Sequence, residues 1–484
     1  MPGSGGSADL CYGGMKMICN TDWSKTCYRP LTDTSCIHIC RVAPSRNAIR
    51  VEVHCTVPDG NCVLSIRKRG TEAWSKPLAA DRGGVTFTNL EEHTEYEFFA
   101  ACEAGKSAVG IARTGDVPGT VVNYLHPEDS RYAFSGQHLC TPSLLRHPDG
   151  YLLASMDVFG RRTPQNLTLI FRSDDGGKTW YHLTELFPCF WGKLFYHRGA
   201  VWMLATSTEY GDLLIGRSDD GGKTWGTPTV LARGSSHWQY PGWHKSAMPV
   251  ISHGGRLWTG IDYGSWSCGG HRSALLSAKE DADLLRAESW HITPPLAYDS
   301  TWQGSVEGDG RGFLEGNAVV LPDGGIADIL RYTTDKGTPN HGLIPILRGN
   351  AAAPDQPLSF DRYIPFPGNL SKFDILFDGV SGYYYSVIDR IYDDGRPAAR
   401  TLLSLVRSAD LTAWDVVADL LDYRHDDAQT VGFQYVSFLF DGDDLLFLSR
   451  TAWNGAKSYH DNNYITFHRV SGFRTLKNKG ESTL

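Results

Sequence analysis

Polar and apolar positions alternate along this chain in short runs that glycine-rich turns separate, and helical periodicity is nearly absent. Between residues 37 and 115 the apolar runs cover residues 49–57, 62–67, 85–88, 96–102 and 109–113. Short strands at this spacing are typical of a small β-sandwich. Residues 1–36 show no period, and we interpret them as an irregular N-terminal arm.

A longer repeat begins after residue 116. Each unit holds an apolar strand, a glycine turn, two further strands and a turn that carries Ser-x-Asp or Trp. The units open at His138, Phe190, Trp243, Glu315, Ser371 and Gly432. One four-stranded blade for each unit predicts a β-propeller of six blades. A seventh blade stays open as an alternative, built from residues 120–135 and the C-terminal tail, because propellers often close by pairing both ends.

Two nearly identical decapeptides mark the turns, FRSDDGGKTW at 171–180 and GRSDDGGKTW at 216–225. The paired glycines supply the positive φ angles that short hairpin loops need. Asp175 and Asp220 can accept hydrogen bonds from the amides of their own turns. Trp180 and Trp225 can anchor the following strand by burial. A degraded third copy, RSADLTAW, covers 407–414.

These motifs resemble known families. Ser-x-Asp-x-Gly-x-Thr-Trp resembles the Asp-box, or BNR repeat, of the sialidase-like β-propellers. LEEHTEY at 90–96 resembles the tyrosine corner of fibronectin type III domains. The expected fold is therefore all-β, with an N-terminal arm at 1–36, a fibronectin III-like sandwich at 37–115 and a catalytic β-propeller at 116–484.

Composition narrows the function. A net charge of −8 argues against a general nucleic-acid or anionic-membrane binder, and no apolar run is long enough for a membrane span. The N-terminal residues are polar, without the apolar core of a signal peptide. We expect a cytoplasmic protein, or a secreted or periplasmic one whose leader was removed. Eight of the eleven cysteines precede residue 103 without C-x2-C spacing, which favours free thiols over disulfides or a structural metal.

The first strand of each blade lines the central channel of a propeller, so residues that open these strands should converge on one funnel. The first strands contribute Gln137, His138, Trp191, Lys193, His244, Lys245, Glu315, Asn317, Lys372, Gln434 and Tyr435. The second strands contribute Asp157, Glu209, Tyr210, Asp262, Tyr263, Arg331, Arg390 and Arg450, and the C-terminal loop adds His460 and Asn462. Cations, aromatic rings and amides together suit an anionic sugar.

From Val121 onward, segments such as WHKSAMPV, LEGNAVVLPDG, SKFDILFD and GFQYVSF give a narrower resemblance. The chain is similar to the L-rhamnose-α-1,4-D-glucuronate lyases and propeller α-L-rhamnosidases and, more distantly, to the ulvan lyases. That resemblance implies seven blades. The chain does not resemble a true sialidase, whose first arginine comes from an Arg-Ile-Pro motif, because residues 138–143 here are HLCTPS.

We favour a polysaccharide lyase, a carbon–oxygen lyase that cleaves at a 4-linked glucuronate by β-elimination. Arg331, Lys245 and Arg450 would neutralise the carboxylate of the sugar. His244 would be the base and Tyr210 the acid, with His138 or His460 as substitutes.

Two alternatives stay open. An α-L-rhamnosidase or another exo-acting glycoside hydrolase would need two carboxylates. Glu315, beside Asn317, is the best candidate acid for it. A non-catalytic glycan-binding propeller is the third class. The expected partner is an acidic oligo- or polysaccharide, and no cofactor is expected. Asp441, Asp443 and Asp444 offer a structural calcium site as the alternative to a plain hairpin turn.

Overall fold

Strands make up nearly all regular structure in the computed structural model. It describes Trp23 and residues 37–55, 61–81, 83–103, 105–235, 239–305, 310–333, 342–393 and 395–476. Two short 3-10 turns, η1(Ala287–Ser289) and η2(Phe473–Thr475), are the helical elements in these ranges. The all-β prediction is confirmed. Apart from Trp23, the predicted arm at 1–36 lies outside the described residues.

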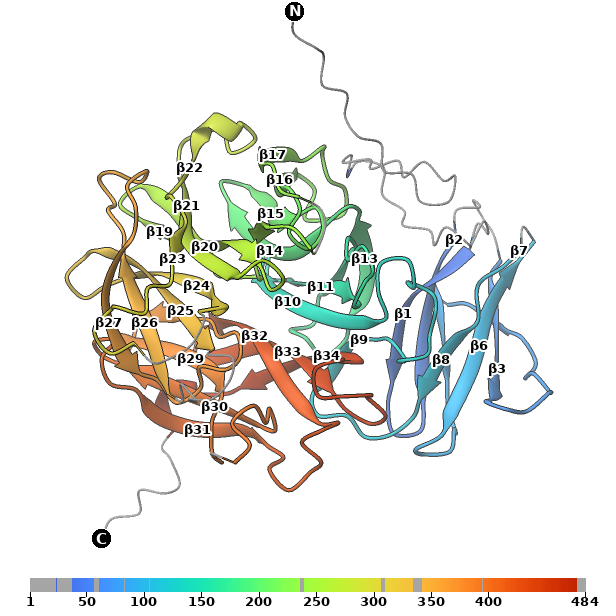
Figure 1. Cartoon of the computed structure of the whole chain (residues 1–484). Helices are drawn as coiled ribbons and strands as arrows, with labels where there is room; N and C mark the ends of the chain where they lie inside the picture. The colour runs from blue at the N-terminus through green and yellow to red at the C-terminus, as the bar shows by residue number, and fades with distance from the viewer. Residues whose placement is uncertain are drawn as a thin grey trace, which may run out of the picture.

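Two sheets pack against each other before the propeller begins (Figure 1). One sheet contains β1(Ile37–Pro44), β2(Ile49–Cys55) and β5(Gly84–Phe87). The other contains β3(Val63–Lys68), β4(Leu78–Ala79), β6(Glu95–Cys102), β7(Gly105–Lys106) and β8(Gly110–Arg113). The Tyr96 hydroxyl accepts a hydrogen bond of 2.9 Å from the backbone N–H of Glu91, as in a tyrosine corner. The fibronectin III assignment stays a prediction.

Six further sheets are arranged in a ring (Figure 1). Blades one and two contain β10(His138–Arg146), β11(Leu152–Phe159), β12(Thr168–Ser173) and β13(Tyr181–Leu186), then β14(Phe190–His197), β15(Ala200–Thr206), β16(Leu213–Ser218) and β17(Thr229–Ala232). Blade three contains β18(Gly242–His244), β19(Ile251–His253), β20(Arg256–Ser265), β21(Gly270–Lys279), β22(Trp290–Ile292) and β23(Leu296–Ala297). Blade four contains β24(Gly312–Val320), β25(Ile326–Thr333), β26(Leu343–Arg348) and β27(Ser359–Pro365). Blade five contains β28(Leu376–Asp378), β29(Tyr383–Asp389), β30(Leu402–Ser408) and β31(Asp415–Asp422).

The sixth blade closes the ring with strands from both ends of the propeller. It contains β32(Gly432–Asp441), β33(Asp444–Ala452), β34(Tyr464–Val470) and β9(Thr120–Tyr124). Strand β9 pairs antiparallel with β34 as the outermost strand. The described residues therefore form six blades, as counted. The segment considered for a seventh blade supplies a single strand, which completes the sixth sheet.

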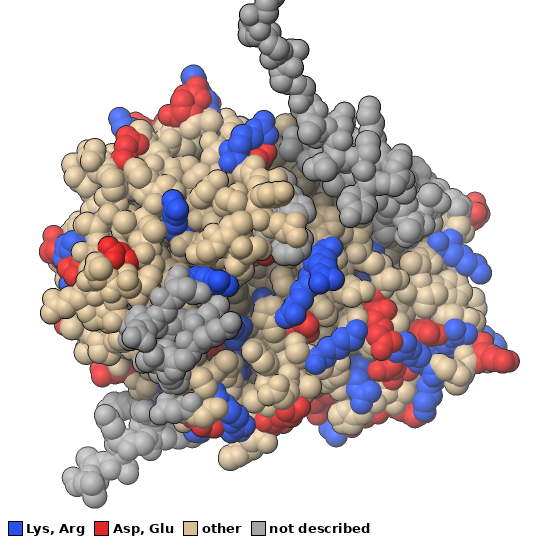
Figure 2. All heavy atoms as spheres, viewed as in Figure 1, with Lys and Arg blue, Asp and Glu red and all other residues tan. Residues whose placement is uncertain are grey.

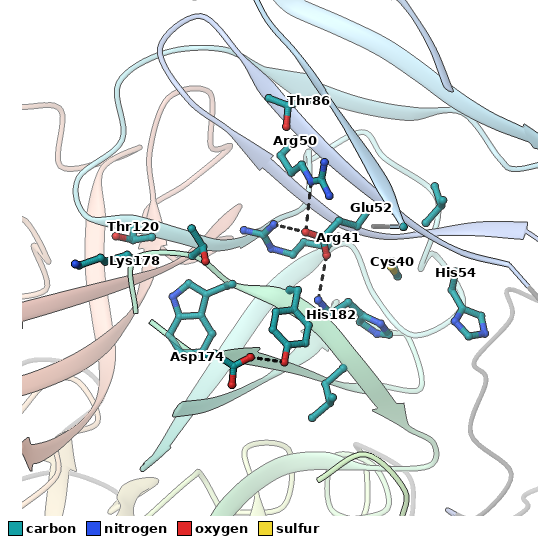
Figure 3. Close-up of a pocket in the computed structure, with 16 residues that line it drawn as sticks. Cys40, Arg41, Arg50, Glu52, His54, Thr86, Thr120, Asp174, Lys178 and His182 are labelled. Atoms are coloured by element: carbon teal, nitrogen blue, oxygen red, sulfur yellow. Dashed lines mark hydrogen bonds and ion pairs between the residues drawn. The ribbon is translucent and has the colours of Figure 1, made fainter. Parts of the chain in front are cut away.

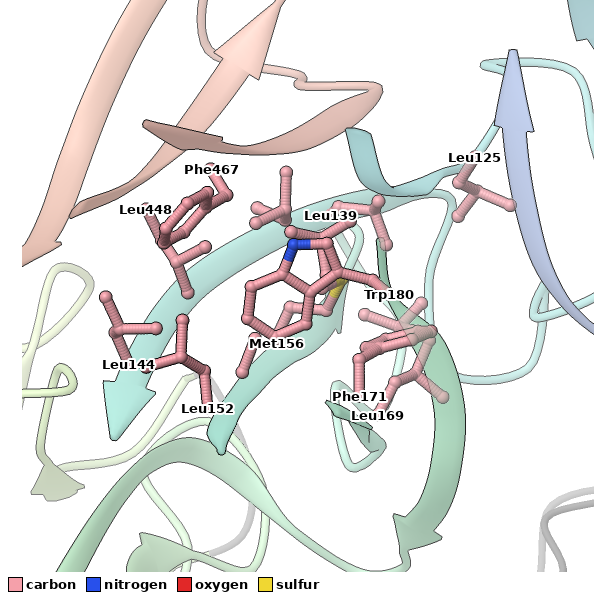
Figure 4. Packing of buried hydrophobic residues seen from close by; sticks show 14 of the residues in the cluster. Leu125, Leu139, Leu144, Leu152, Met156, Leu169, Phe171, Trp180, Leu448 and Phe467 are labelled. Atoms are coloured by element: carbon pink, nitrogen blue, oxygen red, sulfur yellow. The ribbon is translucent and has the colours of Figure 1, made fainter. Parts of the chain in front are cut away.

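Apolar side chains from neighbouring blades fill the space between them. Trp180 of blade one packs on Phe467 of blade six, with ring centroids 5.6 Å apart (Figure 4). Leu152 and Met156 of blade one belong to the same cluster, as does Leu448 of blade six. Burial of this surface joins the first blade to the last one, so ring closure depends on packing as well as on the β9–β34 pairing.

The two decapeptides fold into the same turn. The Gly177 amide donates to the Ser173 hydroxyl at 2.8 Å, and the Gly222 amide donates to Ser218 at 2.8 Å. The carboxylates of the turns accept from Thr179 N and Thr224 N, each at 2.9 Å. Gly176 and Gly177 have φ angles of 74° and 92°, as predicted for the glycine pair. In the degraded third copy Leu411 takes this conformation, with φ at 63°.

A glycine pair in blade one tests this packing. A Cβ at Gly177 would meet the Phe467 ring at 2.1 Å, whereas a Cβ at Gly150, whose φ of 94° is closely similar, meets nothing within 4 Å. We expect Gly150→Ala to cost about 1–2 kcal/mol from backbone strain alone. Gly177→Ala should cost about 1–3 kcal/mol more through overpacking. Denaturant unfolding of both variants measures the difference, and equal losses would contradict the blade contact.

The sandwich contacts the propeller through polar and apolar groups. Arg41 of β1 donates to the carbonyl oxygens of Val122 at 2.7 Å and Val121 at 3.1 Å, both in β9. Tyr124 and Tyr464 of blade six belong to the apolar core of the sandwich. Strand β8 belongs to the sandwich, and the next strand, β9, belongs to blade six. The predicted domain limits, 37–115 and 116–484, stay a prediction.

Candidate active site

Four inner strands carry a β-bulge at the same place. Two residues face one on the neighbouring strand between Cys140 and Ser143, Phe190 and Lys193, Leu314 and Asn317, and Gln434 and Ser437. The first bulged residue has a positive φ in each case, and these residues are Thr141, Trp191, Glu315 and Tyr435, at 45°, 53°, 61° and 54°. Bulges turn side chains in a new direction, and strained non-glycine backbone clusters at functional sites. This repeated distortion marks one end of the channel.

Buried aspartates on second strands hold these bulges. Asp157 of blade one accepts from the backbone N–H of Trp191 in blade two, at 2.9 Å. Asp262 of blade three accepts from the backbone N–H of Glu315 in blade four, also at 2.9 Å. Burial raises the pKa of Asp157 to about 8, although the amides and hydroxyl that it accepts from lower it. Blade one therefore fixes a site residue of blade two, and blade three fixes one of blade four.

Arg331 joins two of the bulged residues. Its Nη1 donates to Glu315 Oε2 at 2.9 Å and to the Tyr435 hydroxyl at 3.2 Å. Burial raises the pKa of Glu315, but the charge of Arg331 outweighs it, so the net pKa is lowered and Glu315 is ionised at neutral pH. Tyr435 is half-buried, while Glu315 is 2% exposed. Tyr435 is therefore more exposed than Glu315.

Two more arginines face the same tyrosine. The guanidinium carbon of Arg450 lies 5.0 Å from the centroid of the Tyr435 ring, and that of Arg400 lies 6.0 Å away. Nη1 of Arg400 is buried without a hydrogen-bond partner among the described residues. Burial raises the pKa of nearby Asp389 to about 7 against the lowering effect of Arg400. The three guanidinium groups thus outnumber the ionised carboxylates around them.

The sequence-predicted residues of blade six position Arg450. The Asn462 side-chain oxygen accepts from Arg450 Nε, and it also accepts from Gln434 Nε2 at 3.0 Å. The backbone oxygen of His460 accepts from Arg450 Nη2. His138 lies at the edge of this group, with Nε2 3.9 Å from Asp461 Oδ2, and burial lowers its pKa. His138 is therefore placed beside Asp461, where the charge of Arg450 also acts on it.

An aromatic cluster adjoins Glu315 and Arg331. The rings of Trp191 and His244 lie 4.0 Å apart, and the Tyr210 hydroxyl lies 3.3 Å from Nε2 of His271. His244 Nδ1 is 3.1 Å from Asp262 Oδ2. Burial lowers the pKa of His244 to about 4, so the imidazole is neutral at pH 7, and burial raises the pKa of Tyr210. His244 and Tyr210 are only 4% and 1% exposed.

The predicted lysines are buried close to one another. Lys193 and Lys245 each follow a site residue along the chain, and all three channel lysines, Lys193, Lys245 and Lys372, are buried. Lys372 Nζ pairs with Asp374 Oδ1 at 2.5 Å. Burial lowers the pKa of Lys193 to about 8 and that of Lys245 to about 7, helped by the neighbouring lysines. The three lysines are therefore close enough to act on one another's charge.

Asn317 has a different environment. Its Nδ2 donates to the Phe373 oxygen at 3.0 Å, and its Oδ1 accepts from the Ile375 amide at 2.9 Å. The side chain joins blade four to blade five, so most of its hydrogen-bonding capacity is taken by backbone.

Sequence reasoning missed Arg400, His271 and the role of Tyr435 at the centre. Arg400 stands between blade strands, in a loop before β30, and His271 is the second residue of β21, so neither opens an inner strand. Figure 2 shows several basic side chains around the centre of the propeller face.

The hairpin between β32 and β33 carries the aspartates considered for calcium. Asp441 pairs with Arg146 at 2.7 Å, and Asp444 pairs with Arg469 at 2.6 Å. Asp443 lies 3.2 Å from Arg474. Within the described ranges no three His, Cys, Asp or Glu side chains are grouped so that they could hold a metal ion. Calcium at this hairpin stays a prediction.

Comparisons with known proteins come from structure alone. No protein-family model and no curated protein matches the sequence. A Hadza microbial sialidase is 12% identical, with 92% of this chain and 95% of that chain covered and a TM-score of 0.49. An α-L-arabinofuranosidase of Fusarium graminearum is 14% identical, with coverages of 73% and 98% and a TM-score of 0.49. An intramolecular trans-sialidase of Ruminococcus gnavus is 13% identical, with coverages of 72% and 96% and a TM-score of 0.47.

Likeness at this level carries no argument about activity, and the propeller assignment rests on the strand pairing described above. The described part of the chain contains no helix of the length and apolarity that a membrane span requires.

Lys245 provides a stability test. Its lowered pKa means that the folded state binds fewer protons than the unfolded state between about pH 7 and pH 10. The free energy of unfolding therefore rises with pH in this window, and the cost of the buried amine is complete below it. Lys245→Met should raise the free energy of unfolding by about 1–4 kcal/mol at pH 6 and much less at pH 10. Urea unfolding at both pH values measures this.

The matched control is Lys178→Met, at an exposed lysine, which should change stability little at either pH. Equal destabilisation of the Lys245 variant at both pH values would mean that its ammonium group is compensated inside the channel.

Proposed function

We propose that this protein cleaves a glycosidic bond of an acidic glycan and binds the carboxylate of the sugar between Arg331, Arg400 and Arg450. The observation that carries this proposal is the excess of guanidinium groups around the half-buried Tyr435, with Glu315 as the ionised carboxylate among them. Guanidinium groups bind carboxylates bidentately, and buried cations need a counter-charge. Aromatic rings beside them suit a pyranose.

Hydrolysis through Tyr435 is the reaction that the contacts favour. Tyr435 and Glu315 are hydrogen-bonded, and ionised Glu315 can accept the phenolic proton, which is the arrangement of a nucleophile and its base. A tyrosine nucleophile is known in sialidases, so a second carboxylate is not needed for this role. Glu315 itself cannot serve as the acid, because Arg331 keeps it ionised. Glu209, whose pKa burial raises to about 7, is the candidate proton donor.

Elimination at a 4-linked glucuronate is the second candidate. His244 is neutral and Tyr210 is protonated at pH 7, which are the states that a base and an acid require. Both face the Arg331–Glu315 pair or Tyr435. Their near-complete burial makes access for a sugar C5 proton harder than access to Tyr435, so we rank elimination second. The rhamnosyl-glucuronate substrate that the sequence resemblance implies stays part of this proposal.

Tyr435→Phe tests the cluster. Loss of the hydroxyl should lower kcat about 10²- to 10⁴-fold while oligosaccharide binding is kept. Arg400→Met should raise KM instead, because it removes a carboxylate contact. Both reactions release a reducing sugar from rhamnosyl-glucuronate glycans, so release without absorbance near roughly 235 nm reports hydrolysis, and release with that absorbance reports the unsaturated uronate of an elimination. Tyr181→Phe, on the outer strand of blade one, is the matched control and should behave like the wild type. Binding without either product would leave a glycan-binding propeller.

The pH profile separates the two reactions. If Glu209 donates the proton, kcat/KM falls as pH rises through about 7, because the acid form is lost. Glu209→Gln should remove this limb together with most of the activity. If His244 is the base, kcat/KM instead rises through about pH 4 as the imidazole loses its proton. A profile that is flat between pH 6 and 8, with Glu209→Gln fully active, would refute the hydrolytic assignment.

A further inference from the structure

A groove of about 790 Å³ lies between the sandwich and blade one, away from the channel (Figure 3). Strands β1 and β2 of the sandwich form one wall, and the first decapeptide turn with the start of β13 forms the other. Its lining includes Cys40, Arg50, Lys178 and His182. No residue of this groove takes part in the site proposed above.

A thiol, an imidazole and a carboxylate meet in this groove. Cys40 of β1 and His182 of β13 line this groove together, and the Cys40 sulfur acts on the charge of the imidazole (Figure 3). His182 Nε2 lies 2.9 Å from Glu185 Oε2 in the same strand. The backbone N–H of His182 donates to Glu52 Oε2 of β2 at 3.1 Å, so the sandwich also fixes the strand that carries the imidazole. A nucleophile beside a base, with a third group that orients the base, is the arrangement of an activated thiol.

The electrostatics agree with this arrangement. Burial lowers the pKa of His182, but Cys40 and the Glu185 carboxylate outweigh it, and the pKa is raised well above its ordinary value. The imidazole can therefore hold a proton taken from the thiol. The other titratable groups that face Cys40 or Glu185 are Arg41, Arg131, Tyr132, His38 and His54.

We propose that Cys40 is a reactive thiol that undergoes exchange, in this groove, with a low-molecular-weight disulfide bearing carboxylates. Lys178 supplies positive charge to the lining, and so does Arg50, which shares Glu52 with Arg41 at a distance of 3.7 Å from Arg50 Nε to Glu52 Oε1. The acids of the lining are already paired, Glu52 with Arg41 at 2.8 Å and Asp174 with Arg172 at 2.7 Å. The net charge offered to a ligand is therefore positive.

The exchange balances without another reactant. The Cys40 thiol passes its proton to His182, and the sulfur attacks one sulfur of the disulfide. The disulfide bond breaks, a mixed disulfide forms on Cys40, and the second sulfur leaves as a thiolate that takes the proton back from the imidazolium.

Other cysteines of the chain serve as internal references. Cys268 is exposed, and its thiol donates to the Gln239 oxygen at 2.9 Å. Cys40 is only 5% exposed, so Cys140 and Cys189, which are also buried, are the reference for burial alone, and burial raises the pKa of these two thiols. Exposure alone predicts that Cys268 reacts first, whereas activation by His182 predicts Cys40.

The test uses 5,5′-dithiobis(2-nitrobenzoate), a disulfide with two carboxylates, at pH 6 on the full chain, with peptide mapping by mass spectrometry. We expect Cys40 to be modified at least about tenfold faster than Cys268. His182→Gln should slow Cys40 about tenfold and leave Cys268 unchanged, and Glu185→Gln should give a smaller loss. Tyr181→Phe, beside His182 in the groove, is the matched control that should keep the wild-type rate.

Two results would overturn the proposal: modification of Cys40 as slow as that of Cys140 and Cys189, or a Cys40 rate that neither His182→Gln nor Glu185→Gln changes. If His182→Gln fails to fold, the pH dependence of the wild-type rate decides. An activated thiol keeps its advantage over Cys268 at pH 6, whereas an ordinary thiol loses it. Glycan cleavage is read on the same samples, so failure of either proposal is seen separately.

Discussion

The hydrogen bonds from bulged backbone amides to buried aspartates are the constraint on which the site depends. Asp262 holds the Glu315 amide with one carboxylate oxygen and orients His244 with the same atom. The strained backbone of Glu315, at φ 61°, is stable because a neighbouring blade overdetermines it. A propeller thus builds its site from contacts between blades, and the chain segments involved are remote from one another in sequence.

Buried carboxyl groups within this site take opposite charge states. The groups that each carboxyl contacts decide whether it is protonated or ionised. Asp157 accepts hydrogen bonds from neutral groups, and its pKa rises. Glu315 is buried as deeply, but Arg331 contacts it directly, and its pKa falls. Burial lowers the pKa of His244, so His244 is neutral although Asp262 is close, and burial raises the pKa of Asp262 as well. A cationic pocket with one ionised carboxylate follows from these pairings, whereas the numbers of acidic and basic residues alone would not give it.

Sequence patterns could predict the fold to the level of blades. Alternation predicted the strands, the repeat predicted six units, and the turn motifs predicted the hydrogen bonds that Asp175 and Asp220 accept from the amides of their own turns. Convergence of strand openings also placed Glu315, Tyr435 and Trp191 together. The bulges were not visible, because one extra residue in a strand leaves the apolar pattern nearly unchanged. Without them, Lys193 and Trp191 look equivalent, yet the bulge turns Trp191 to the aromatic cluster and leaves Lys193 in the channel. Arg400 was invisible for another reason, since it belongs to a loop and reaches Tyr435 only through tertiary packing.

The closure of the ring connects this site with the sandwich. Strand β9 completes blade six and directly follows the last strand of the sandwich in the chain. Arg41 of the sandwich is hydrogen-bonded to two carbonyl oxygens of the same strand and to Glu52, which in turn accepts from the His182 amide of blade one. One polar chain therefore links β1, the closing strand and blade one at the place where the first and last blades meet. Separation of the sandwich from blade one would break these bonds beside Trp180 and Phe467, so the sandwich contributes to the same closure that keeps Glu315, Arg331 and Tyr435 in contact.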